Sequence, residues 1–145
     1  MGTKEKQDRL VEILRTWQGV EKRSVSQAAE IIERTRNPVI RMVMEIIQRD
    51  SAQHHRVQQF ILDSLETEAI TLTVDDLAQV WSAIEAHIAA ERETAALIAA
   101  ARAALAGTRN VVQQLLLSYL ANDERKHDQL LEDLSLVKRG MFKSA

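Results

Sequence analysis

The stretch LSYLANDERKHDQLLEDL, residues 117–134, contains the pattern that decides the fold. Its apolar residues, one glutamate and one histidine recur in alternating steps of three and four. These positions are Leu117, Leu120, Glu124, His127, Leu131 and Leu134. Such steps place side chains on one face of an α-helix. The stretch therefore predicts a helix whose apolar seam carries a carboxylate and an imidazole near its middle.

Few residues interrupt helices in this chain of 145 residues, which has one proline and four glycines. The pattern predicts helix starts at Pro38 and after Thr73, and helix ends at Gly107 and Gly140. We expect helices over residues 4–36, 38–68, 74–106 and 109–138. Short connections make neighbouring helices antiparallel, so the predicted fold is an all-α, up-down four-helix bundle forming a single domain over residues 1–145.

Each predicted seam carries an ionisable residue near its midpoint. These residues are Glu21, His54, Glu91, Glu124 and His127. The midpoints of an up-down bundle lie at one level, so we expect these side chains to converge in the core. Burying several carboxylates together is very costly unless a cation compensates them. Three glutamates and two histidines offer oxygen and nitrogen ligands suited to iron, manganese or zinc.

Two alternatives stay open at this point. The polar side chains in the seams also fit a hydrogen-bonded layer that only fixes the helix register. His87 lies four residues before Glu91, on the same helix face, and is a candidate extra ligand or a polar surface residue. The spacing Glu124-x-x-His127 is common by chance, so the metal prediction depends on the agreement in level across four helices.

Four segments resemble the ligand-bearing helices of the ferritin-like superfamily, closest to short rubrerythrin-type proteins. They are WQGVEKR, IIQRDSAQHH, HIAAERE and LANDERKHDQL. The resemblance covers nearly the whole chain, and its strongest motif is the last one. It implies a metal centre, commonly di-iron, with oxidase, peroxidase or metal-handling activity, and a homodimer or larger homo-oligomer. Whether the protein is an enzyme stays open.

The two halves of the sequence look like related helical hairpins. Glu21 precedes His54 by 33 residues, and Glu91 precedes His127 by 36. The main departure from the family's pattern is Ser51, which stands where a bridging glutamate is expected. One or two ions per chain fit the predicted ligands. Because Ser51 is a poor ligand, we expect one well-occupied ion beside Glu91, His127 and Glu124, and a second ion site that is weak or missing. The resemblance also implies that Asp50 and Asp123 orient the two histidines.

Composition excludes several classes of function. A net charge of −2 and a pI near 6.1 provide no basic excess for nucleic acid or an anionic membrane. The chain has no cysteine, which excludes disulfides, cysteine-bound zinc, iron–sulfur clusters and thiol catalysis. With no apolar run long enough for a membrane span and a charged N-terminus, we expect a cytoplasmic protein. The alternative function is a non-catalytic helical-bundle interaction protein with a degenerate metal site.

Overall fold

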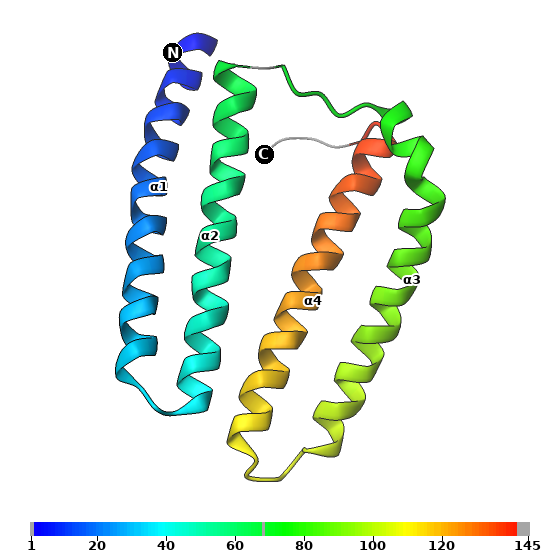
Figure 1. Ribbon diagram of the computed structural model, residues 1–145. Coiled ribbons are helices and arrows are strands. Elements are labelled where there is room, and N and C mark those ends of the chain that lie inside the picture. The colour runs from blue at the N-terminus through cyan, green and yellow to red at the C-terminus, as the bar shows by residue number, and fades with distance from the viewer. Residues whose placement is uncertain (1, 68, 142–145) are drawn as a thin grey trace. The chain divides into compact units, whose positions relative to one another are not determined.

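A computed structural model describes residues 2–67 and 69–141 of the chain. That part contains four long helices and no strands, which confirms the all-α class (Figure 1). The helices are α1 (Thr3–Arg34), α2 (Pro38–Glu66), α3 (Val74–Ala104) and α4 (Val111–Lys138). The predicted ends agree within two residues, except the predicted end of the second helix at Glu68, which lies outside the described residues.

Side chains and one backbone feature explain where the helices begin and end. Asn37 caps α2, because its Oδ1 accepts hydrogen bonds from the backbone N of Val39 at 2.9 Å and of Ile40 at 3.2 Å. Thr73 and Asp76 form the expected capping box at the start of α3. Gly107 follows α3 with a φ of +75°, a conformation that side chains with a Cβ rarely adopt.

The four helices form two antiparallel hairpins (Figure 1). Helix α1 packs along α2, and α3 packs along α4. The chain divides into two compact units at this boundary, residues 1–70 and residues 71–145. The closing of both hairpins into one bundle domain stays a prediction.

The first hairpin buries a mixed apolar and polar contact line between α1 and α2. Its buried apolar side chains are Leu14, Ala28 and Leu62. Its buried polar side chains are Gln18, Glu21, Ser51 and Gln58. Trp17 is half exposed in this hairpin, and the line of contact between the two helices runs through its neighbour Gln18 instead.

The second hairpin buries less apolar surface, and Leu77 is the one fully buried apolar side chain among its described residues. Trp81 lies on the same helix, donates a hydrogen bond from Nε1 to Glu85 at 2.9 Å, and has the ammonium of Lys138 5.0 Å from its ring centre. The contact with Lys138 ties the start of α3 to the end of α4. None of the helices in the described part of the chain is long and apolar enough to cross a bilayer.

Candidate metal centre

The second hairpin brings together three of the predicted ligands. Glu124 and His127 lie one turn apart on the same face of α4, and Glu91 faces them from α3. One ligand atom from each residue lies within 4.8 Å of the other two. Within residues 2–67 and 69–141, this is the one group of three or more such side chains close enough to share a cation.

The distances inside the cluster are too long for hydrogen bonds to His127. Its Nδ1 lies 3.5 Å from Oε2 of Glu91 and 3.8 Å from Oε1 of Glu124. Three atoms here are buried and have no hydrogen-bond partner, namely Oε2 of Glu91, Oε2 of Glu124 and Nδ1 of His127. Native proteins rarely leave buried polar atoms without partners, so these three atoms need an explanation.

A cation between the three side chains accounts for both observations. Oxygen and nitrogen ligands bind a transition metal at about 2.1 Å, and at tetrahedral angles two such ligands lie about 3.4 Å apart. The observed separations of 3.5 and 3.8 Å are close to this value. Two carboxylates would balance the charge of one divalent ion, and the imidazole would supply a neutral third ligand. The donor set therefore fits zinc, iron or manganese.

The two carboxyl groups of the cluster influence each other's ionisation. The close approach of the other carboxyl group lowers the pKa of Glu91 and raises the pKa of Glu124 from the ordinary value of 4.5. Burial and the neighbouring charge of Asp128 raise the pKa of Glu124 further, while His127 favours the charged form of both carboxylates. Protons and a cation thus compete for the same oxygen atoms.

His87 lies beside the cluster, and the group of three mutually close ligands does not include it. Its Nε2 is 2.9 Å from Oε1 of Glu91, within hydrogen-bond distance, and its side chain is 60 % exposed. This contact occupies one oxygen of Glu91 and leaves Oε2 for the cluster. His87 thus holds the position of a residue that orients a ligand. Its role as a direct ligand stays a prediction.

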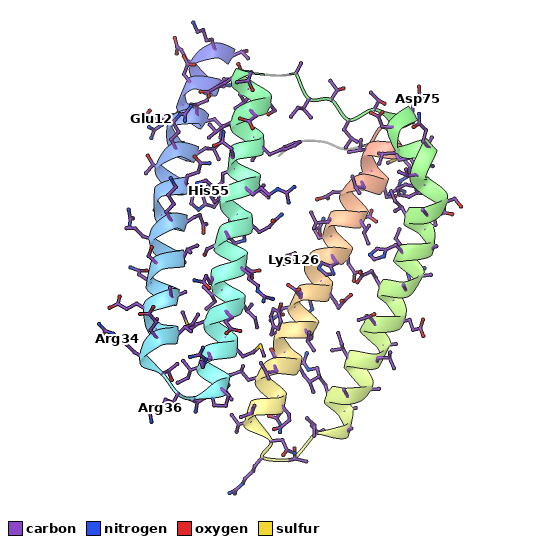
Figure 2. All side chains as sticks on the ribbon, viewed as in Figure 1. Glu12, Arg34, Arg36, His55, Asp75 and Lys126 are labelled. Carbon is purple, nitrogen blue, oxygen red and sulfur yellow. The ribbon has the colours of Figure 1, made fainter. Side chains whose placement is uncertain are left out.

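Asp123 occupies the other side of His127. Its Oδ2 lies 3.9 Å from Nε2 of His127, and Lys126 forms an ion pair with its Oδ1 at 2.9 Å. Figure 2 labels Lys126 on α4. An anionic group near Nε2 favours the proton on that nitrogen and leaves Nδ1 free to bind a cation.

The first hairpin brings together two predicted ligands and a pair of hydroxyls. Nδ1 of His54 lies 3.4 Å from Oε1 of Glu21, whose side chain is only 9 % exposed, whereas that of His54 is 59 % exposed. The Oγ atoms of Ser24 and Ser51 form a hydrogen bond of 2.9 Å. The serine that replaces the expected glutamate therefore has a partner in the protein. That Glu21 and His54 join the centre formed by Glu91, Glu124 and His127 stays a prediction.

One buried polar residue of the first hairpin, Gln18, was not among the predicted site residues. Gln18 donates from Nε2 to Oε1 of Gln59 at 3.0 Å and to the backbone O of His55 at 3.4 Å. His55, labelled on α2 in Figure 2, is half-buried and lines an open pocket together with Glu21. Gln18 lies three residues before Glu21 and therefore shares a helix face with it. This spacing is the signal in the sequence that points to its burial.

Comparisons with known proteins give no relative. No protein family, no curated protein and no solved structure matches this chain. The site must therefore be interpreted from its own geometry.

Proposed function

We propose that the protein is a metal-binding protein whose principal ion lies between Glu91, Glu124 and His127, in a ferritin-like four-helix bundle. The single observation that supports this most strongly is the cluster of these three side chains within 4.8 Å of one another in the α3–α4 hairpin, each with a buried atom that has no hydrogen-bond partner. Iron is the proposed metal by resemblance, and manganese and zinc fit the same donors. A bound ion would supply Lewis acidity or redox chemistry to this hairpin.

The protein's own residues would prepare the centre in three ways. Glu91 and Glu124 supply the charge that balances the ion, and the i, i+3 spacing holds Glu124 and His127 on one face of α4. His87 fixes one oxygen of Glu91, so that the other remains directed into the cluster. We propose oxidase, peroxidase or metal-handling activity in the cytoplasm. A second ion beside Glu21 and His54 is weak or missing, because Ser51 supplies neither charge nor a good ligand.

A metal titration with two matched histidine variants tests this proposal. Purified protein is freed of metal with chelator and titrated with Mn²⁺, and bound metal is measured by elemental analysis after desalting. We expect one tightly bound ion per wild-type chain. His127→Ala removes one of three ligands and should weaken binding by about 100-fold or more, since loss of a residue that merely supports a ligand already costs about 10- to 100-fold.

The control is His54→Ala, which removes the corresponding histidine from the first hairpin. We expect its affinity for the first ion to stay within about twofold of wild type. Equal losses in the two variants would place the principal ion elsewhere. Failure of the wild-type protein to bind Mn²⁺, Fe²⁺ or Zn²⁺ would leave the alternative function, a helical-bundle protein that acts by association and has a degenerate site.

A further inference from the structure

A pocket of about 200 Å³ opens between α3 and α4, directly beside the proposed metal ligand Glu124. Small and branched apolar side chains form part of its wall, from Ile98 and Ala99 on α3 and Ala121 on α4. Its charged lining residues are Arg102, Arg125, Asp128 and Glu124 itself. The pocket lies entirely within the second hairpin and shares Glu124 with the metal cluster.

The size of the pocket limits what it can hold. Its volume equals that of about six or seven water molecules, at about 30 Å³ each in the liquid. Pockets for drug-sized molecules begin at about 300 Å³. The alanines at positions 99 and 121 create the space, because a larger side chain at either position would extend into it. A molecule of about six non-hydrogen atoms, with a short carbon chain, fits this volume.

The charges around the pocket favour an anion once the metal is bound. A divalent ion would balance Glu91 and Glu124, so the two arginines then exceed Asp128 by one positive charge. Arg125 donates one hydrogen bond, from NH1 to Oδ1 of Asn122 at 3.1 Å, and a guanidinium has five donor hydrogens. Arginine binds carboxylates well because its planar donors match the two oxygens.

We propose that this pocket binds a short-chain monocarboxylate beside the metal, with Arg102 and Arg125 as its charge partners and Ile98, Ala99 and Ala121 against its carbon chain. The proposal rests on the proposed function, because without a cation the carboxylate of Glu124 repels such a ligand. The chemical class of the ligand follows from the two kinds of residue that line the pocket. The arginines select its carboxylate, and the apolar wall selects its carbon chain.

Calorimetric titration of butyrate into Mn²⁺-loaded protein tests the proposal. We expect saturable binding to wild-type protein and none of butan-1-ol, which has the same chain without the charge. Arg102→Ala and Arg125→Ala should each weaken butyrate binding by about tenfold, as expected for a charge-assisted hydrogen bond. The matched control Arg109→Ala removes an arginine of the same hairpin that does not line the pocket, and its affinity should stay within about twofold.

A second variant tests the volume independently of charge. Ala99→Leu keeps a good helix former at an exposed helical position and should fill the pocket. We expect it to abolish butyrate binding while it still binds one Mn²⁺ per chain. The bound Mn²⁺ is measured for every sample. If the wild-type protein binds Mn²⁺ but not butyrate, the proposal for the pocket is overturned and the proposed function is not. A wild type that does not bind metal overturns the proposed function and this proposal together. Equal losses in Arg109→Ala and the two pocket variants would also overturn it.

Discussion

The two hairpins have the same architecture but satisfy their buried polar side chains in different ways. Each has two antiparallel helices of about 30 residues with a glutamate on one helix facing a histidine on the other. In α1–α2, the position three residues before the histidine is Ser51, and its hydroxyl is hydrogen-bonded to Ser24. In α3–α4 the corresponding residue is Glu124, and it contributes to a cluster of three unpartnered atoms.

The difference lies in how each hairpin satisfies its buried polar atoms. Two hydroxyls satisfy each other, because each can both donate and accept. Two carboxyl groups can satisfy each other only by sharing a proton, and the pKa values of Glu91 and Glu124 move in opposite directions. Ser24 and Ser51 thus satisfy each other with protein atoms alone, whereas the cluster of the second hairpin has buried atoms without partners.

The largest expected effect comes from making the first hairpin resemble the second. Ser51→Glu supplies the carboxylate that α1–α2 lacks and places it three residues before His54, near Glu21. We expect bound Mn²⁺ to rise from one ion to two per chain, measured by elemental analysis after desalting. Ser51→Ala is the matched control and should leave the count at one. A count of one in Ser51→Glu would show that the two hairpins differ by more than this residue.

Metal should stabilise the second hairpin more than the first. A ligand present at about 100 times its Kd stabilises the folded state by about 2.7 kcal/mol. For a chain of this length that corresponds to a rise in Tm of about 5 to 10 °C. We expect thermal melts to show this shift when Mn²⁺ replaces chelator. Amide hydrogen exchange should slow mainly in α3 and α4; equal slowing in all four helices would mean that the chain unfolds as one unit.

The stability of the metal-free protein should depend on pH through Glu124. Its folded-state pKa is raised, so its stabilising effect is present below the ordinary value of 4.5 and is lost as the pH rises through the folded-state pKa. The pKa of Glu91 is lowered, so its contribution is present above 4.5 and is lost as the pH falls through its folded-state pKa. Glu124→Gln should therefore flatten the fall in Tm that the wild type shows in chelator as the pH rises above about 4.5.

Glu93→Gln is the control for this pH dependence, because it removes an exposed carboxylate two residues from Glu91 on α3. Its melts should follow the wild-type pH profile. If both variants flatten the profile equally, the general charge of α3–α4 would be responsible, and the proximity of Glu91 and Glu124 would have no special role.

The smallest expected effect concerns a flaw in the first hairpin. Oε1 of Gln58 is buried without a hydrogen-bond partner, and the residue is 3 % exposed. Gln58→Leu removes this atom and should stabilise the protein by about 1 kcal/mol in chemical denaturation. Gln53→Leu, at an exposed position of the same helix, should change stability by less than about 0.5 kcal/mol. Destabilisation by Gln58→Leu would indicate a polar partner for this residue in solution.

The sequence was sufficient to predict the helices, because capping residues and breakers act locally. Asn37, Thr73 and Gly107 fix their helix boundaries through contacts within a few residues. The cluster on α3–α4 was also predictable. The spacing of Glu124 and His127 puts them on one helix face, and Glu91 lies at the same level of the facing helix. The exposed position of Trp17 and the burial of Gln18 were not predictable. They depend on the rotation of α1 against α2, which is set by the sum of many weak side-chain contacts.

The contact between His87 and Glu91 has a consequence for how fast a cation can enter the centre. The pKa of Glu124 is raised, so its carboxyl group keeps a proton to a higher pH than usual, and an arriving ion must displace that proton. Oε2 of Glu91 is buried without a hydrogen-bond partner, whereas its Oε1 lies 2.9 Å from Nε2 of His87, whose side chain is 60 % exposed. His87 thus connects the buried cluster to solvent, into which the displaced proton must pass as an ion binds.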